Sequence, residues 1–240
     1  MNALVIGGNK GFGRSISLNL QNHGYNITTI GRSKESIKGS IHYSCDVSDI
    51  KKYENILKQI RSEEYEINIL ACITGFARAT KIEDVMSNFA EHEEKNITYI
   101  QRAKSILRPV IPNSTKSKII TIGSQWSYKV NTEELYAYNT CKNYLMQYCR
   151  MIAKVSKPCI NHYCVPTMDT HQYYEVKNSF RNVGREDIIA NFTPNGLAKP
   201  QTIAKSLINT ALNTDKSGNT FVIMPNGIVN NLEEHLMMIT

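Results

Sequence analysis

Short continuous runs of apolar residues alternate along the chain with longer segments in which apolar residues recur every three or four positions. Continuous runs of this length are typical of strands that are buried on both faces of a parallel sheet. The pattern predicts strands at residues 3–6, 25–30, 41–44, 67–73, 118–122, 160–165 and 220–224.

The segments between these runs have the period of amphipathic helices. Ile16 and Leu20, in the first of them, are four positions apart and share one helical face. Strands and helices that alternate in this way form right-handed crossovers, which predicts an α/β fold with a parallel sheet covered on both faces. Further helices are predicted at about 50–60, 89–108, 138–156 and 201–212.

Most connections are short, so we predict one domain over residues 1–240. The exception is the stretch 167–199, which holds several aromatic residues and shows no regular period. A long irregular segment inside a compact domain is usually functional, and we expect this one to be a substrate loop.

The composition is that of a globular protein, with 41% hydrophobic and 20% charged residues. No apolar run reaches the roughly 18–20 residues that span a bilayer. The apolar stretch at the N-terminus is too short for a signal peptide, so we expect a cytoplasmic protein without a membrane partner. The six cysteines form no CxxC pair and have no metal-binding spacing, which favours reduced, buried thiols and no metal site.

The formal net charge of +7 is less informative than where the charge lies. Lys10, Arg14, Arg32 and Lys34 all precede the first carboxylate, Glu35, in a stretch that is rich in glycine. Glycine together with unopposed cations is what a phosphate-binding segment requires. A basic chain could also bind nucleic acid, but no nucleic-acid module and no basic and aromatic stripe is visible in the sequence.

Glycines follow the first strand directly, at Gly7, Gly11 and Gly13, and a helix comes next. A tight turn and a close approach of a pyrophosphate to backbone N–H groups both favour glycine at such positions. The alternative is a simple connection between a strand and a helix. The position after the first strand favours a dinucleotide site.

Arg32 stands at the end of the second strand, where a carboxylate would select NAD. A guanidinium there can bind a 2′-phosphate, and Lys10 could add a second cation, so we predict NADP(H). The alternative for both residues is a solvated surface charge. Asp46, after the third strand, could accept from the adenine amino group or cap the following helix.

Tyr138 and Lys142 are four residues apart, on one face of a predicted helix. Ser124 ends the strand before that helix, whereas the similar pair Tyr173 and Lys177 lies in the irregular stretch. Hydride reduction of a carbonyl needs a proton donor near neutral pH, and a neighbouring ammonium favours the tyrosine phenolate. The serine hydroxyl could bind the same substrate oxygen as charge develops there.

The resemblance of the chain to the short-chain dehydrogenase/reductase family covers nearly its whole length, including segments at 165–170, 198–204 and 217–222. It implies a three-layer α/β/α Rossmann fold with a seven-stranded parallel sheet. It also implies an NADP(H)-dependent oxidoreductase that reduces a ketone or aldehyde, or oxidises the alcohol, in a biosynthetic pathway. The motif residues that carry the resemblance are Gly7, Gly11, Gly13, Asp46, Asn96, Ser124, Tyr138 and Lys142.

By this resemblance Tyr138 is the acid/base, Ser124 polarises the carbonyl, Lys142 holds the nicotinamide ribose and Asn96 positions a water in the proton relay. Ser127 is a rival for the role of Ser124, because Ser124 lies one residue further from the tyrosine than usual. The predicted cofactor-binding residues are Gly7, Asn9, Lys10, Gly11, Phe12, Gly13, Arg32, Ser33, Asp46, Val47, Thr74, Gly75, Tyr138, Lys142, Pro166, Met168 and Thr170.

The chain departs from the family pattern in three places. Ile6 replaces a threonine before the first glycine, the segment 72–75 replaces Asn-Asn-Ala-Gly, and Thr167 replaces a glycine. These changes bear on cofactor affinity more than on chemistry, since no catalytic group is lost.

Aromatic and polar residues near the site predict a medium-sized, partly polar or cyclic small-molecule substrate. An acyl thioester on an acyl carrier protein is the alternative, with Arg102 or Lys129 as exposed contacts for an acidic carrier. The family resemblance implies a homodimer or homotetramer, and a catalytically idle NADP(H)-binding regulator on the same fold is the alternative function. The predicted substrate residues are Trp126, Tyr128, His171, Tyr173 and Tyr174, with Met168 beside them.

Overall fold

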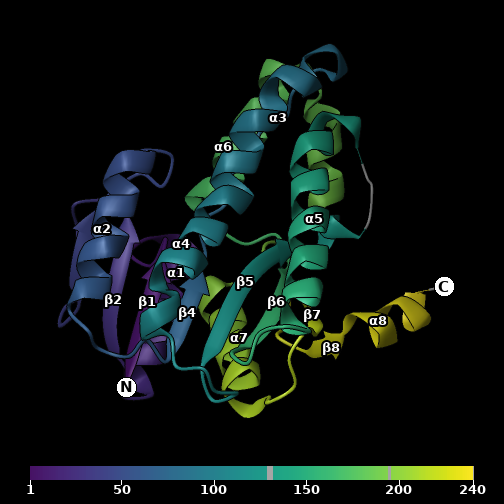
Figure 1. The fold of residues 1–240 in the computed structure, drawn as a ribbon. Coiled ribbons are helices and arrows are strands. Elements are labelled where there is room, and N and C mark those ends of the chain that lie inside the picture. The colour runs from purple at the N-terminus through teal and green to yellow at the C-terminus, as the bar shows by residue number, and fades with distance from the viewer. Residues whose placement is uncertain (129–131, 194–195, 240) are drawn as a thin grey trace.

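The computed structural model describes residues 1–128, 132–193 and 196–239. Its strands form one sheet in the order β3-β2-β1-β4-β5-β6-β7-β8, with helices on both faces (Figure 1). The strands are β1 (Asn2–Ile6), β2 (Asn26–Gly31), β3 (Ile41–Ser44), β4 (Ile69–Cys72), β5 (Lys118–Ser124), β6 (Cys159–Val165), β7 (Thr220–Ile223) and β8 (Val229–Asn231).

The three-layer α/β/α architecture predicted from the sequence is confirmed, with a difference in the number of strands. The pairs from β3 through β7 are parallel, as predicted, but β8 adds an antiparallel strand beside β7, with Phe221 opposite Asn231. This strand has three residues, two of them asparagine, so it lacks the apolar run that identified the others.

The helices lie close to their predicted positions, except that the helix expected at 89–108 is interrupted. A π-helical segment, Glu94–Thr98, lies between α3 and α4. The helices are α1 (Gly11–Asn22), α2 (Ile50–Ser62), α3 (Val85–Glu93), α4 (Tyr99–Leu107), α5 (Tyr136–Ala153), α6 (His171–Asn182), α7 (Pro200–Asn213) and α8 (Leu232–Ile239).

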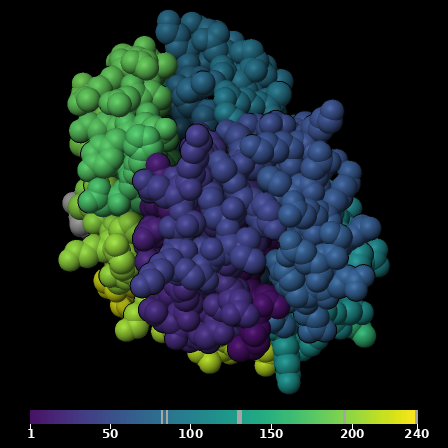
Figure 2. Space-filling view, turned by 90° about the vertical axis from the view of Figure 1, so that its left-hand side faces the viewer, coloured from purple at the N-terminus to yellow at the C-terminus, as the bar shows by residue number. Residues whose placement is uncertain are grey.

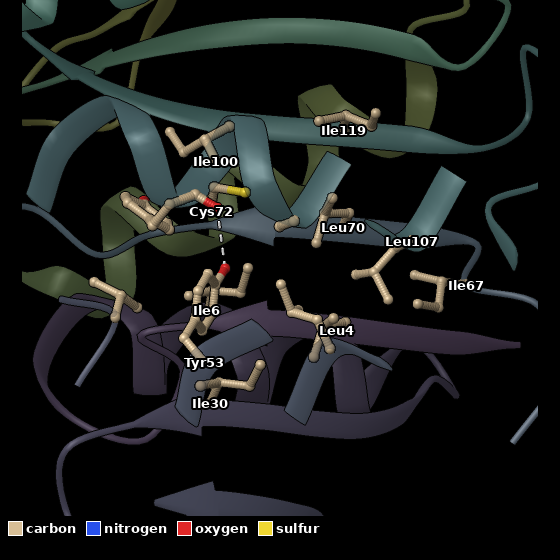
Figure 3. Packing of buried hydrophobic residues seen from close by; sticks show 14 of the residues in the cluster. Leu4, Ile6, Ile30, Tyr53, Ile67, Leu70, Cys72, Ile100, Leu107 and Ile119 are labelled. Carbon is tan, nitrogen blue, oxygen red and sulfur yellow. Dashed lines mark hydrogen bonds between the residues drawn. The ribbon is translucent and has the colours of Figure 1, made fainter. Parts of the chain in front are cut away.

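Two hydrophobic clusters fill the two faces of the sheet. One joins the sheet to α2, α4 and α5 and contains Tyr53, whose hydroxyl donates to the backbone oxygen of Tyr99 at 3.1 Å (Figure 3). The other joins the sheet to α1 and α7. Burial of this apolar surface is the main force that holds helices to sheet. The six cysteines are free and buried, as the sequence predicted.

The stretch 167–199 is not irregular, which corrects the prediction from the sequence. It contains α6 and a 3-10 helix, Glu186–Phe192. Within α6 only Ser179 and Phe180 are buried, so most of the helix surface is not part of the core. Among the described helices none is long and apolar enough to cross a membrane.

His162 on β6 is buried between the sheet and α5. Its Nδ1 is hydrogen-bonded to the Thr121 hydroxyl at 2.9 Å, while no described atom pairs with its Nε2. Its ring occupies the space beside Gly123, where a Cβ would lie 2.1 Å from Nε2. Burial, together with the positive charges of Lys142 and Arg150, lowers the pKa of His162 from 6.5 to about 3.

We therefore expect acid to destabilise the fold through His162. The unfolded chain binds a proton below about pH 6.5 while the folded chain does not, so stability present above that pH is lost as the pH falls toward 3. Urea unfolding at pH 7 and pH 5 should show about 2 kcal/mol less stability at pH 5 from this residue. His162→Gln should remove that part of the pH dependence and the exposed His23→Gln should not; equal pH dependence in both would refute the assignment.

Candidate functional site

The glycine turn after β1 depends on two close approaches. A Cβ on Gly13 would lie 1.9 Å from the Gly7 oxygen, and one on Gly7 would lie 2.7 Å from the Thr74 hydroxyl. Gly7 and Gly11 also have positive φ values, +87° and +50°. Lys10, the N-cap of α1, makes no side-chain capping bond, and the first turn holds no acidic residue. The N–H groups at this end of α1 are therefore free of a competing carboxylate.

Asn9 fastens this turn to the segment after β2. Its side chain is buried and its Nδ2 donates to the Glu35 oxygen at 2.9 Å and the Ser33 oxygen at 3.4 Å. Gly31 permits this approach, because a Cβ there would lie 2.3 Å from Asn9 Oδ1. Asn9 thus holds Arg32 next to the turn, and its own side chain is committed to the protein.

The cations predicted for the adenosine end are accessible, and the predicted acid is held in its charged form. Lys10 and Arg32 are exposed. Burial raises the pKa of Asp46, but hydrogen bonds from Ser48 and the charges of Arg32 and Lys95 outweigh burial, so this pKa lies below its usual value. Asp46 does not cap α2, which corrects one of its two interpretations.

The cap of α2 is Asp49, whose carboxylate accepts from the Lys52 backbone N–H at 3.2 Å. Asp46 instead accepts from the Ser48 backbone and hydroxyl at 3.0 and 2.6 Å. It is fixed in position at the end of β3, beside Arg32.

Ser124, Tyr138 and Lys142 meet where β5 ends and α5 begins. The Ser124 hydroxyl faces the Tyr138 phenol closely enough to lower its pKa, and Lys142 Nζ lies 5.8 Å from the tyrosine ring centroid. Lys142 is buried and donates to the Ile122 oxygen at 3.0 Å. Burial raises the pKa of Tyr138 to about 12, against the effect of Ser124, and lowers the pKa of Lys142 to about 8.

Ser127, the rival for Ser124, is occupied elsewhere. Its hydroxyl accepts from the Ser124 backbone N–H at 3.1 Å, and its carbonyl accepts from the Asn143 side chain at 2.9 Å. Ser124 is therefore the serine of this pair that faces Tyr138.

Asn96 lies in the π-helical segment and joins it to the loop after β4. Its Nδ2 donates to the Phe76 and His92 oxygens, each at 2.9 Å, and its Oδ1 accepts from the Phe76 N–H at 3.1 Å. A Cβ on Gly75 would lie 3.7 Å from Asn96 Oδ1 and 3.5 Å from Lys142 Nζ. The structure thus brings all four predicted catalytic residues to one corner of the site.

Gln172 also reaches this corner, and sequence reasoning missed it. Its Nε2 lies 3.6 Å from the same Cβ position on Gly75. The available signal was its place two residues after Thr170, whose methyl lies 3.7 Å from the Cβ position on Gly11. Both residues belong to the start of α6, which lies over the glycine turn.

Other predicted cofactor residues could act only in part through their side chains. Phe12 and Val47 are buried in the two hydrophobic clusters, and Met168 packs against one of them, so Phe12 and Val47 offer backbone contacts. Pro166 is buried. Thr74 stabilises the segment 72–75, where the chain differs from the family pattern, because its backbone N–H donates to the Ile6 oxygen at 3.2 Å.

Each predicted substrate residue whose contacts follow has a packing or pairing partner within the chain. Trp126 packs edge-on against Phe192 at 4.8 Å between centroids, and Tyr128 packs against His235 of α8 at 5.8 Å. His171 has 85% of its side chain exposed and lies 3.4 Å from Glu175.

Tyr173 and Tyr174 contact each other, at 5.1 Å between centroids, and Tyr174 donates to Asp169 at 3.1 Å. Arg102 is not a free exposed cation, since it pairs with Glu54 and Glu94. Lys129 lies outside the described residues.

Comparison with known proteins places this arrangement in a family. A family model described as short chain dehydrogenase matches residues 1–176, which hold the glycine turn and all four predicted catalytic residues. The chain belongs to the short-chain dehydrogenase family. This confirms the family resemblance that the sequence motifs indicated.

Relatives within this short-chain dehydrogenase family are distant in sequence and close in fold. Carbonyl reductase family member 4 of Xenopus tropicalis is 26% identical over 62% of this chain, and the match spans 66% of that relative, just under two thirds of its length. A short-chain dehydrogenase family protein of Francisella tularensis has a TM-score of 0.79 at 20% identity, covering 92% of this chain and 96% of that one. A short-chain dehydrogenase of Burkholderia cenocepacia in complex with NADP has a TM-score of 0.75 at 16% identity, covering 94% and 96%.

The bonds of Asn96 give a prediction about stability. Asn96→Ala leaves backbone groups of a partly buried loop and of the buried His92 without partners, so the free energy of unfolding should fall by about 2–4 kcal/mol. Urea unfolding measures this change, and the exposed Asn22→Ala is the control. A loss no larger than that of the control would show that Asn96 does not hold the loop.

Proposed function

We propose that this short-chain dehydrogenase is an NADP(H)-dependent oxidoreductase that reduces a ketone or aldehyde carbonyl, or oxidises the corresponding alcohol. The observation that carries the proposal is the contact of Ser124 with Tyr138 beside the buried Lys142, at the end of the strand that leads to the catalytic helix. The glycine turn lies at the same edge of the parallel sheet.

The residues of the chain fit this cofactor. The turn leaves room where side chains at Gly7 and Gly13 would collide, and the N-terminus of α1 is free to receive a diphosphate. Arg32 and Lys10 would bind the 2′-phosphate, and Asp46 would accept from the adenine amino group. NADPH, when bound, would supply the hydride. The NADP complex of a structural relative supports this choice for the family, and the preference for NADP over NAD is our proposal for this chain.

Tyr138 would donate the proton to the substrate oxygen. A pKa of about 12 keeps its phenol protonated near neutral pH, as a donor must be. Ser124 would hydrogen-bond the same oxygen, and stabilise the negative charge as it develops. With a pKa of about 8, Lys142 is mostly charged near pH 7, and its ammonium would favour the phenolate left by proton transfer while binding the nicotinamide ribose.

Replacing Tyr138 tests the chemistry. Tyr138→Phe should lower kcat/KM for a carbonyl substrate by about 10²–10⁴-fold, since it removes the proton donor, and leave NADPH affinity nearly unchanged. A panel of ketones, aldehydes and acyl thioesters assayed by NADPH oxidation would measure this. Tyr136→Phe, two residues earlier on α5 and 49% exposed, is the control.

Turnover that survives Tyr138→Phe would overturn the proposed mechanism. Tight NADPH binding without turnover of any substrate by the unaltered chain would support instead an idle NADP(H)-binding regulator.

Replacing Arg32 tests the cofactor. Arg32→Asp should weaken NADPH binding by about 10–100-fold, the loss of a charge-assisted bond, and leave NADH binding equal or stronger. Fluorescence titration with both cofactors measures the preference. Arg61→Asp at the far end of α2 makes the same charge change and should alter neither affinity; an unchanged preference in Arg32→Asp would refute the role of Arg32.

The biosynthetic role, the cytoplasmic location, the homodimer or homotetramer and the small-molecule substrate stay predictions. The acyl carrier alternative has less support than the sequence gave reason to expect, because the carboxylates of Glu54 and Glu94 neutralise Arg102.

A further inference from the structure

A third hydrophobic cluster lies above the sheet, apart from the two on its faces. It joins Leu135, just before α5, to Phe180 of α6 and to Ile188 of the 3-10 helix. A hydrogen bond of 2.8 Å from the Ala79 N–H to the Ser179 hydroxyl adds the loop after β4. Residues 171–192, here called the cap segment, are therefore packed against both loops that border the catalytic corner (Figure 1).

The start of the cap segment reaches the site itself. Thr170, its N-cap, lies against Gly11, and Gln172 lies against Gly75 beside Lys142 and Asn96. Figure 2 shows the green cap segment alongside the purple N-terminal residues that include the glycine turn. Any outward movement of the cap segment would thus uncover the positions that the proposed function assigns to the cofactor.

An ion pair ties the turn within the cap segment to the 3-10 helix Glu133–Leu135, which directly precedes the catalytic helix. Glu134 is buried, with 5% of its side chain exposed, and its carboxylate accepts from Arg185 and from the Thr132 hydroxyl. Its backbone oxygen accepts from the Thr80 N–H at 3.0 Å. Arg185 also contacts Asp187, at 3.3 Å.

Because Glu134 is buried, loss of its pair with Arg185 has a large cost in free energy. A buried carboxylate that loses its cation keeps the full cost of its burial, unlike an exposed ion pair. The packing on the sheet does not require a charge at this place. Among the described residues, the cation that pairs with this carboxylate is Arg185, which the packed cap segment brings to it.

We propose that the Glu134–Arg185 pair is a latch that holds the cap segment over the glycine turn and Gly75, which makes both of them positioning residues. The effect on turnover rests on the proposed function, while closure of the cap segment does not. The latch joins the segment that covers the cofactor to residues just before α5, outside the groups that carry out the proposed chemistry.

The test compares two arginines of the cap segment. Arg185→Gln breaks the latch, whereas Arg181→Gln breaks an exposed pair with Glu186, 2.7 Å long, that lies within the cap segment. Arg185→Gln should raise KM for NADPH and for the carbonyl substrate about tenfold with kcat within about twofold, because closure is weakened and the chemistry is intact. Arg181→Gln should match the unaltered chain.

A double variant separates the latch from a general loss of structure. Glu134→Gln with Arg185→Gln leaves two neutral groups and no buried unpaired charge. The double variant should therefore lower KM most of the way from the raised value of Arg185→Gln back to that of the unaltered chain. Absence of recovery would mean that Arg185 acts in some other way and would overturn the latch.

Hydrogen exchange of the unliganded chain distinguishes failure of the latch from failure of the proposed function. Amides in 171–192 should exchange about tenfold faster in Arg185→Gln than in Arg181→Gln, whatever the activity. Equal exchange in the two variants would refute the latch. Absence of turnover in the unaltered chain, with the difference in exchange present, would refute the proposed reaction and leave the latch standing.

Discussion

The close contact of Gly13 with the Gly7 oxygen is the constraint on which the rest of the site depends. Because no Cβ intervenes at 1.9 Å, α1 can begin directly over the end of β1. Its N-terminus then faces the same edge of the sheet at which β4 and β5 deliver Gly75 and Ser124. A parallel sheet gathers the ends of its strands at one edge, and this turn adds a helix end to that edge. Binding and chemistry meet there for that reason.

Much of the fold could be predicted because buried parallel strands are short, continuous apolar runs. The elements that were missed are not identified by a local sequence pattern. Residues 229–231 form a strand through pairing with β7, not through hydrophobicity, and α6 buries only Ser179 and Phe180. The π-helical segment around Asn96 reflects hydrogen bonds to Phe76, twenty residues away in the chain.

The residues of the site also fall into two groups: those that a local sequence motif predicts and those that it does not. Residues whose role depends on a local motif, such as Ser124 and Tyr138, meet where the motif predicted. Trp126 and Tyr128 were predicted as substrate residues because they are aromatic and follow Ser124 closely, but their packing partners, Phe192 and His235, come from distant segments that no local motif identifies. Arg185 and its partner are 51 positions apart, and neither has a sequence neighbour that would mark it. Pairing between distant segments is decided by the fold, so it has no signature in a single sequence.

The short antiparallel strand β8 has a consequence for how copies of this chain behave together. Open sheet edges expose backbone donors and acceptors that can pair with another molecule, and long flat edges promote aggregation. Here one edge is β8, with three residues, and the other is β3, with four. β8 covers the side of β7 that would otherwise continue the parallel ladder. The sheet therefore offers two short edges as templates for edge-to-edge pairing with another copy of the chain.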